Sequence, residues 1–242
     1  MWLFDRFKKK KDTKPIETTT IITSAPNNYN LQNSALKELW YNGTEIQWKE
    51  ALNSYYLLLR PEQRGLDDYI NNLNAENVKS LDENAFYEFL YNKYFVWKYT
   101  AKNRLATTRK SLEKYIRNGE LLKLKDIQAR IFSIPNDNVG ECLSAACEIY
   151  GLGTAGASGL LAILFPTDFG TVDQFVVRRL QEINHPIYNA ELCNMKPEGL
   201  KIKDGIILVE IMKEKAKELN KKYNTDFWTP RKIDMVLWAF GR

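Results

Sequence analysis

Apolar residues recur at helical spacing along most of the chain from about Leu31 onward. Intervals of three and four residues place such side chains on one face of a helix. Strict alternation of apolar and polar residues, which is typical of half-buried strands, is weak throughout. The β-branched run at 16–23 is the strongest instance, and it lies in a stretch rich in Thr, Asn and Pro. The pattern therefore predicts an all-α fold.

Residues that commonly begin or end helices mark the limits of several predicted helices. Arg60-Pro61 ends one of them, because a residue before proline avoids the helical region. Thr107 or Thr108 is expected to cap another, and Gly119 to end it. The expected helices are Ile46–Leu59, Asp82–Tyr99, Arg109–Asn118, Leu121–Phe132, Val139–Tyr150, Ala157–Phe165, Gln174–Ile183, Ile206–Tyr223 and Lys232–Phe240.

Residues 1–30 are predicted to be a basic N-terminal arm followed by a flexible linker. Residues 1–14 carry six Lys/Arg against two Asp/Glu, and residues 12–30 lack helical periodicity. Such an arm suits an acidic membrane surface or a nucleic acid. Residues 31–242 are expected to form one all-α region, in which two helical subdomains pack together around a substantial core.

Composition narrows the class of protein. With 44% hydrophobic and 27% charged residues, the chain is typical of a soluble globular protein. Cys142, Cys147 and Cys193 include no C-x-x-C pair, so we expect neither zinc nor a Cys-ligated iron–sulfur cluster, and no metal held by side chains. No apolar run approaches the roughly 20 residues that span a bilayer, and the N-terminus is no signal peptide. We therefore expect a monomeric cytoplasmic protein, nucleoid-associated in a bacterium.

Basic residues are concentrated in one stretch. Residues 98–130 carry ten Lys/Arg against three Asp/Glu, although the net charge of the whole chain is only +5. A local excess of this size indicates a polyanion binder, and a solvated helix face explains it equally well. Arg104, Arg109 and Lys110 are the candidate phosphate contacts, and binding through them would weaken steeply with salt.

The segment richest in candidate chemistry is 150–180, which reads YGLGTAGASGLLAILFPTDFGTVDQFVVRRL. Its first part predicts a helix, a tight turn and a helix, in which Gly151 and Gly153 permit a positive φ or a close backbone approach. Free amides at the start of the second helix would form a natural phosphate seat. By itself, a tight helix-to-helix turn without any ligand is the better explanation of the two glycines.

The hairpin, the apolar helix after it and Val172-Asp173 together resemble the helix-hairpin-helix (HhH-GPD) DNA glycosylase superfamily. Members carry a hairpin of the type L-P-G-V-G-x-x-T-A, then an apolar helix, then a loop ending in V-D-x-x-V-x-R. Here the hairpin is Tyr150–Ala157 and the closing element is Val172–Arg178. The resemblance covers about 30 residues, in which the turn, the helix and the aspartate fall at the family's spacing.

The chain departs from the family's pattern at three places. Tyr150 stands where the family has a proline, Gly156 stands where it has a threonine, and residues 169–171 replace a Gly/Pro-rich segment before the aspartate. None of these differences removes a chemical group that the mechanism needs. A fourth difference concerns chemistry. In bifunctional members a lysine 18 residues before the aspartate attacks the sugar and forms a Schiff base, and here that position is Ala155. The resemblance therefore implies a monofunctional enzyme that uses water and leaves an abasic site. Replacement of the missing amine by Lys123 or Lys125 is the less favoured alternative.

The resemblance assigns catalysis to Asp173. Breaking an N-glycosidic bond builds positive charge on the deoxyribose, as in glycoside hydrolysis. A carboxylate beside the anomeric carbon stabilises that charge and orients or deprotonates a water molecule. An N-cap explains Asp173 as well, because it directly precedes the predicted helix at Gln174. The two roles are compatible.

The resemblance also implies which residues contact DNA. A flipped base must be held against aromatic or apolar side chains, and Trp97, Gln174 and Phe175 are the candidates, although most aromatic residues of 91–99 are expected in the core. The resemblance is also compatible with a monovalent cation bound by the backbone of the hairpin. The predicted DNA contacts are Gly151, Leu152, Gly153, Thr154, Ala155, Gly156, Arg104, Arg109, Lys110 and Arg178.

The function implied is base excision from double-stranded DNA. Water, assisted by Asp173, would hydrolyse the N-glycosidic bond of a damaged or modified base and leave an abasic site. Two alternatives stay open: a helix-hairpin-helix protein that binds DNA without catalysis, and an all-α interaction protein with no nucleic-acid role. The target base is not readable from the sequence, and both repair and defence against foreign DNA fit.

Overall fold

The computed structural model describes residues 28–241 of the chain, with side chains from residue 35 onward. Within that range every regular element is a helix and no strand occurs, which confirms the all-α prediction. The elements are α1 (Asn28–Asn42), α2 (Glu45–Leu58), α3 (Pro61–Asn71), α4 (Ala75–Lys79), α5 (Glu83–Phe89), the π-helix η1 (Leu90–Tyr94), α6 (Phe95–Lys98), α7 (Lys102–Leu112), α8 (Lys114–Arg117), α9 (Leu121–Ile131), α10 (Val139–Cys147), α11 (Thr154–Leu164), α12 (Gln174–Glu182), α13 (Asn189–Asn194), α14 (Ile202–Tyr223) and α15 (Pro230–Phe240).

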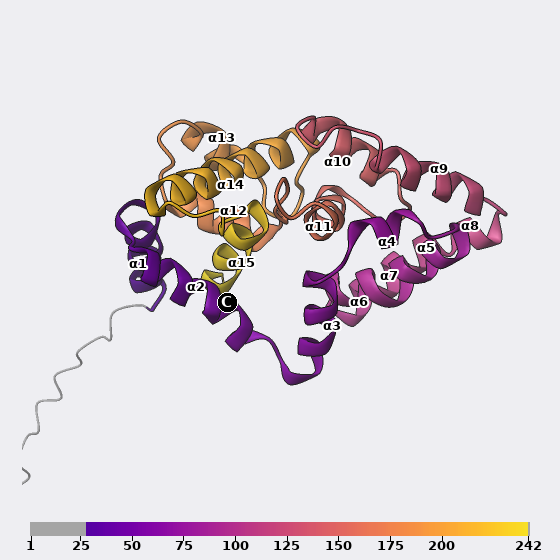
Figure 1. Cartoon of the computed structure of the whole chain (residues 1–242), viewed down its shortest axis with the longest axis horizontal. Helices are drawn as coiled ribbons and strands as arrows, with labels where there is room; N and C mark the ends of the chain where they lie inside the picture. Colours follow the sequence, from indigo (N-terminus) through magenta and orange to yellow (C-terminus); the bar gives the residue numbers. More distant parts are fainter. Residues whose placement is uncertain (1–27, 242) are drawn as a thin grey trace, which may run out of the picture.

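The helices gather in two groups, and α10 and α11 lie between them (Figure 1). One group holds α1, α2 and α12–α15, and the other holds α3–α9. Helix α10 packs against α9 on one side and α14 on the other, so it joins the two groups. The chain leaves the first group after α2 and returns to it at α12, which places residues distant in sequence on opposite walls of the space between the groups.

The start of α1 corrects one predicted boundary. Residues 28–30, predicted as the end of the linker, form the first residues of α1. The buried side chains Leu36, Leu39 and Trp40 anchor this helix in the core, and extending an anchored helix by a residue costs little compared with starting one. The rest of the predicted arm and linker, residues 1–27, lies outside the described residues.

Tryptophan side chains fill the core of the first group. Trp48 of α2 is 1% exposed, and its ring centroid lies 5.9 Å from that of Trp40 and 5.6 Å from that of Trp228. Thr44 caps α2 in a capping box with Gln47, which fixes where the helix begins. The tilted and edge-to-face arrangement of these rings joins α2 to the segment before α15.

The predicted helix Asp82–Tyr99 contains a π-helical turn. Asp82 caps α5 through the amide of Ala85, and η1 then interrupts the α-helical pattern over Leu90–Tyr94. Leu90 and Tyr94 are fully buried, so the wider turn accommodates large core side chains. π-helical turns of this kind occur frequently at functional sites.

The threonine cap predicted near residue 107 is wrong. Thr107 and Thr108 lie inside α7, which begins at Lys102, and the Thr107 hydroxyl donates to the carbonyl of Asn103 one turn earlier. This back-bonding uses the hydroxyl that a cap would need. The predicted end is confirmed, because Gly119 has a φ of +68° beyond α8.

Helix α11 is the central element of the fold, and Figure 1 shows it nearly end-on between the two groups. Every residue from Gly156 to Leu164 is buried. Its glycines let other side chains reach its backbone: a Cβ on Gly159 would lie 2.8 Å from the Tyr94 hydroxyl and 3.2 Å from Cδ of Lys98. On the other side, a Cβ on Gly205 of α14 would lie 2.8 Å from Cγ2 of Thr154.

We expect Trp48→Ala to lower the free energy of unfolding by roughly 3–5 kcal/mol, because it opens a cavity in a core of interlocked rings. Ile46→Ala on the same helix is the matched control. Ile46 is 70% exposed, so its loss should change stability by less than about 0.5 kcal/mol. Urea titration followed by circular dichroism measures both. Equal effects of the two substitutions would contradict the packing described for α2.

Candidate active site

The turn between α10 and α11 requires glycine at Gly151. Its φ is +96°, and a Cβ there would lie 2.9 Å from the carbonyl oxygen of Thr108 on α7. The helix, tight turn and helix predicted for this segment are therefore present, although α10 ends at Cys147, three residues before the predicted Tyr150. Leu152 turns inward and is 7% exposed, so its side chain belongs to the core.

A groove of about 560 Å³ runs over the start of α11. The backbone from Gly153 to Gly156 forms one wall, and Arg104 and Glu198 belong to the others. The first amides of a helix have no intrahelical acceptor and carry the positive end of the helix dipole. The predicted contacts that the structure brings into this groove are Gly151, Gly153, Thr154, Ala155, Gly156, Arg104, Gln174 and Phe175.

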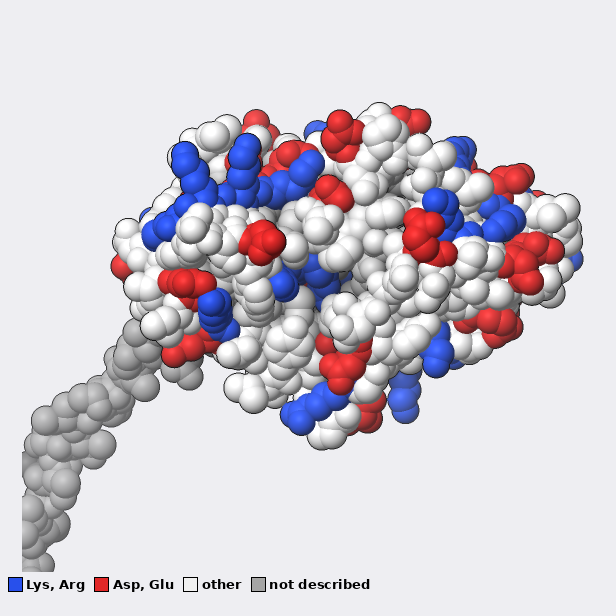
Figure 2. All heavy atoms as spheres, viewed as in Figure 1, with Lys and Arg blue, Asp and Glu red and all other residues white. Residues whose placement is uncertain are grey.

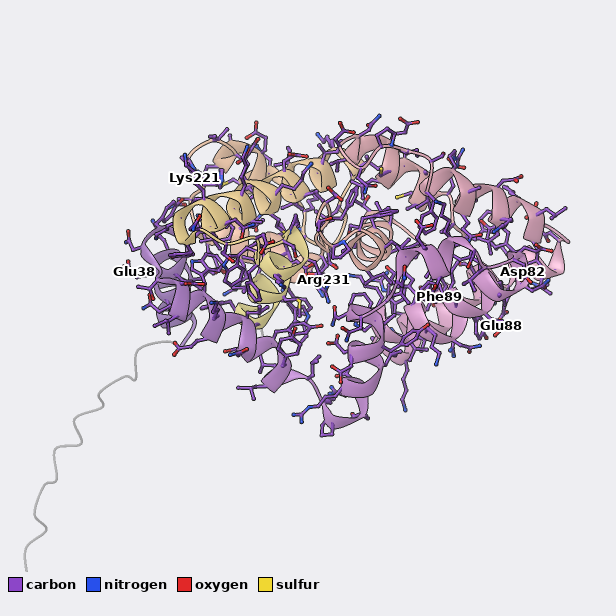
Figure 3. All side chains as sticks on the ribbon, in the orientation of Figure 1. Glu38, Asp82, Glu88, Phe89, Lys221 and Arg231 are labelled. Carbon is purple, nitrogen blue, oxygen red and sulfur yellow. The ribbon has the colours of Figure 1, made fainter. Side chains whose placement is uncertain are left out.

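A deeper cavity of about 380 Å³ lies beside the groove, between the two groups of helices. The two share several lining residues, among them Lys98, Asp173 and Phe175. The cavity is walled by α3 and α6 on one side and by α2, α12 and α15 on the other. Figure 2 shows this face hollowed near its middle, with basic atoms at the position where Figure 3 labels Arg231.

Asp173 stands where the cavity meets the groove. Its Oδ1 accepts the amides of Phe175 at 2.9 Å and Val176 at 3.3 Å, so the residue is the N-cap of α12, as the sequence predicts. The preceding Val172 is held by its amide, which donates to Oγ of Ser158 on α11 at 2.9 Å. The side chain of Asp173 is 21% exposed. Capping thus fixes the carboxylate in the opening and leaves it within reach of a ligand.

Lys98 is a residue of the site that the sequence did not predict. Its Nζ lies 3.6 Å from Oδ2 of Asp173, and its side chain is 9% exposed. Burial lowers the pKa of this amine, and the carboxylates of Asp173 and Asp234 oppose that shift. No motif marks Lys98, because it approaches Asp173 only through the packing of α6 on α11. Its position beside Trp97, at the start of the basic stretch, was the available signal.

A buried ion pair forms the inner wall of the cavity. Arg231 and Asp234 of α15 are 6% and 2% exposed, and Nη1 of the arginine donates to Oδ1 of the aspartate. Oδ2 of Asp234 accepts the amide of Thr171 at 2.6 Å. Burial raises the pKa of Asp234 to about 6, and the Arg231 guanidinium and the amide of Thr171 oppose that rise.

The opposite wall carries a second buried carboxylate, Asp67 of α3, which is 1% exposed. It accepts hydrogen bonds from the hydroxyl of Tyr55 at 2.6 Å, Nε1 of Trp97 at 2.9 Å and Nδ2 of Asn71 at 2.8 Å. Arg231 donates to Oδ1 of Asn71 at 3.2 Å. These bonds join α2, α3, α6 and α15 across the cavity and hold its aromatic side chains in place.

The aromatic lining includes two of the three predicted base-pocket residues. Trp97 and Phe175 line the cavity, whereas Gln174 lines only the groove. Trp238 of α15 also lines the cavity, and its ring lies 5.2 Å from that of Tyr55. Thr171, which also lines the cavity, has a buried hydroxyl with no hydrogen-bond partner among the described residues.

The basic stretch at 98–130 does not form one surface. Arg104 faces the groove, but Nε of Arg109 donates to the carbonyl of Tyr91 at 3.0 Å and its guanidinium stacks on that ring. Lys110 is exposed and lies outside the groove lining. Arg178 pairs with Glu198 at 3.2 Å at the groove rim.

The two lysines considered as substitutes for the missing amine lie elsewhere. Lys123 donates to the hydroxyl of Tyr150 at 2.8 Å, and Lys125 donates to the carbonyl of Leu81. Neither lines the cavity or the groove. Lys98 is therefore the amine that the fold brings to Asp173.

Metal ligation has no candidate among residues 28–241, which contain no group of three or more His, Cys, Asp or Glu arranged around a common point. The three cysteines are free thiols, with Cys142 buried and Cys193 exposed. No helix in the same range is long and apolar enough to cross a membrane.

We expect Arg231→Met to lower the free energy of unfolding by roughly 3–5 kcal/mol at pH 7, because it leaves the buried carboxylate of Asp234 without its partner. Arg178→Met is the matched control, since its ion pair with Glu198 is exposed and is worth less than about 1 kcal/mol. Chemical denaturation measures both. If Arg231→Met lowered the free energy of unfolding no more than Arg178→Met does, the ion pair of Arg231 with Asp234 would not be what holds the cavity wall.

Comparisons of the chain with protein-family models, with curated proteins and with solved structures found no match. The site itself consists of a capped carboxylate at the mouth of a cavity, a buried amine beside it, aromatic walls and a groove over a helix N-terminus.

Proposed function

We propose that the protein excises a damaged or modified base from double-stranded DNA by hydrolysis of the N-glycosidic bond, leaving an abasic site. The observation that carries the proposal is the position of Asp173, at the junction of a deep cavity with a groove over the start of α11. A base in the cavity and its phosphates in the groove would place the connecting sugar beside this carboxylate. The resemblance of residues 150–178 to helix-hairpin-helix DNA glycosylases supports the same assignment.

Asp173 suits the electrostatic task. Departure of the base leaves positive charge on the sugar, and a fixed carboxylate stabilises it without having to reorganise. The capping amides hold Oδ1 in place, so Oδ2 is the oxygen that would face the sugar or position the attacking water. Nζ of Lys98 lies 3.6 Å from Oδ2 and marks the side of the carboxylate that faces the cavity and the groove.

The cavity suits an extruded base. Its volume of about 380 Å³ falls within the range of roughly 300–1,000 Å³ that is usual for small-ligand sites. Trp97, Phe175 and Trp238 supply aromatic surface for stacking, and Asp173 and Lys98 supply polar groups at the mouth of the cavity. Aromatic contact combined with a few fixed polar groups is how enzymes hold a flipped base.

The groove suits the phosphates on either side of that nucleotide. The amides at the start of α11 are anion-binding groups by geometry. The small residues Gly153 and Ala155 allow a close approach, and a Cβ on Gly153 would meet nothing within 4 Å. Arg104 adds a positive charge on the wall opposite α11. Backbone contacts of this type position DNA without reading its sequence.

A protein that binds DNA without catalysis is the second candidate, because the capping of α12 accounts for Asp173 on its own. In that case the groove would bind DNA, and the carboxylate would have no chemical role. The two candidates differ in one observable: base release from modified duplexes.

We expect Asp173→Asn to reduce base excision by about 100- to 1,000-fold, because it removes the charge that stabilises the transition state. Asparagine caps a helix as well as aspartate does, so the variant separates catalysis from capping. Incubation with a panel of modified duplexes, followed by alkali cleavage of abasic sites, measures the rate. Wild-type and variant proteins with equal rates would disprove the catalytic role, and an inactive wild type that still binds DNA would favour the second candidate.

We expect Arg104→Gln to weaken DNA binding about equally for all sequences and to reduce the slope of log affinity against log salt by about one. Lys221→Gln is the matched control, because Lys221 lies at the far end of α14, away from the hollow in the middle of this face (Figure 3). Fluorescence anisotropy at several salt concentrations measures both. An unchanged slope for Arg104→Gln would remove Arg104 from the DNA contact.

A further inference from the structure

The segment between α11 and α12 leads to Asp173, and the first turn of α15 packs along it. The amide of Arg231 donates to the carbonyl of Pro166, at the beginning of the segment, at 3.4 Å. Further along, a Cβ on Gly170 would lie only 2.7 Å from the carbonyl oxygen of Pro230. No helix forms in this segment, so these contacts with α15 help to set the course of its backbone.

The last two residues before Asp173 are held by their amides. The amide of Thr171 donates to Oδ2 of Asp234 at 2.6 Å, and the amide of Val172 donates to Oγ of Ser158 at 2.9 Å. Successive residues are thus attached to two different helices, α15 and α11. Because Asp173 follows directly, the direction in which its carboxylate enters the opening depends on both hydrogen bonds.

We propose that Asp234 is a positioning residue, which places the carboxylate of Asp173 for base excision through the amide of Thr171, and that loss of the Asp234 charge in mild acid lowers the excision rate. The inference rests on the proposed function for the reaction that is measured. Asp234 acts through the backbone, so its role requires no contact with the sugar. A displacement of a reacting group by about 1 Å is enough to slow an enzyme by about 100-fold.

The charges around Asp234 explain why its hydrogen bond to Thr171 responds to pH. The ionisable groups that face it are Arg231 on α15, Lys98 on α6, Asp173 before α12 and Tyr55 on α2. Burial and the charge of Asp173 raise the pKa of Asp234 to about 6, against the guanidinium, the Thr171 amide and the amine of Lys98. The carboxyl group therefore titrates in a range where an ordinary aspartate stays ionised.

Protonation weakens the hold on Thr171. A hydrogen bond to an ionised carboxylate is roughly twice as strong as one to a neutral group, so protonated Asp234 holds the amide less firmly. Arg231 then also loses the ion partner that its Nη1 contacts, which is unfavourable for a buried guanidinium. As the pH falls through about 6, the segment before Asp173 should loosen and the excision rate should fall.

Two double variants separate the hydrogen bond from the charges. Both carry Arg231→Met, so that no guanidinium is left buried without its partner, and they combine it with Asp234→Asn or with Asp234→Leu. Asparagine offers the Thr171 amide an acceptor oxygen, whereas leucine, of similar size, offers none. We expect kcat for base excision to be at least about 10-fold lower with leucine than with asparagine, and duplex binding to agree within about twofold.

The pH dependence supplies a second readout. With a pKa of about 6 for Asp234, wild-type excision should fall about 10-fold between about pH 7 and pH 5, and the double variant with Asp234→Asn should not show this fall. Hydrogen exchange, measured by NMR on the wild-type protein without DNA, reports on the bond itself. The protection factor of the Thr171 amide should fall over the same range, and that of the Phe165 amide, which donates to the carbonyl of Leu161, should not.

Equal kcat values for the two folded double variants would overturn the inference and leave the proposed function standing. So would an acid fall that persists with Asp234→Asn, or a Thr171 amide whose protection does not change with pH. If circular dichroism shows that the double variants do not fold, the exchange measurement on the wild type decides. Loss of protection at Thr171 in a protein that releases no base supports the hold of Asp234 on this segment and counts against the proposed function.

Discussion

The contact between the backbone of α11 and the side chains of η1 and α6 is the constraint on which the site depends. Gly159 leaves room for the Tyr94 hydroxyl and the stem of Lys98, and Tyr94 in turn donates to the carbonyl of Gly156. A side chain on either glycine would push the two groups of helices apart at this point. Because α11 also packs on α14 and α15, this contact sets the distance between the walls of the cavity.

Buried charges hold the other side of the same space. Arg231 pairs with Asp234, and Asp67 accepts three hydrogen bonds from residues of α2, α3 and α6. A buried carboxylate is costly unless it is fully paired, so each of these groups restricts the helices that supply its partners. The same network keeps Trp97 and Tyr55 against the cavity. Stability and the shape of the site therefore depend on the same bonds.

Asp173 combines the capping of α12 with the position that the proposed catalysis requires. Its capping bonds to α12 use Oδ1, and the lysine from α6 approaches Oδ2. Capping holds the side chain in one conformation, which is the condition for electrostatic stabilisation of a developing charge. In the proposed base excision, Oδ2 of this carboxylate would face the sugar at the glycosidic bond, because Oδ1 is held by the capping amides.

Local features of the fold were predictable from residues close together in sequence. Helical periodicity gave the all-α class, Gly119 ended a helix, and Asp173 capped α12 as its place before Gln174 indicated. Of the two turn glycines, Gly151 has the expected positive φ. Gly153 has a φ of −103° and nothing within 4 Å of a Cβ placed on it, so that part of the prediction was wrong. The threonine cap was wrong because the Thr107 hydroxyl bonds the carbonyl one turn before it.

The sequence by itself determined the class of fold, the helix–turn–helix segment and the capped aspartate, because periodicity, glycine geometry and capping act over a few residues. Only the tertiary structure decided which groups surround that aspartate. Lys98, Asp67 and Arg231 come from α6, α3 and α15, and the basic stretch was divided because packing directed Arg109 to Tyr91 and left Arg104 in the groove. Contacts between distant helices depend on how whole faces pack, which no short pattern of residues records.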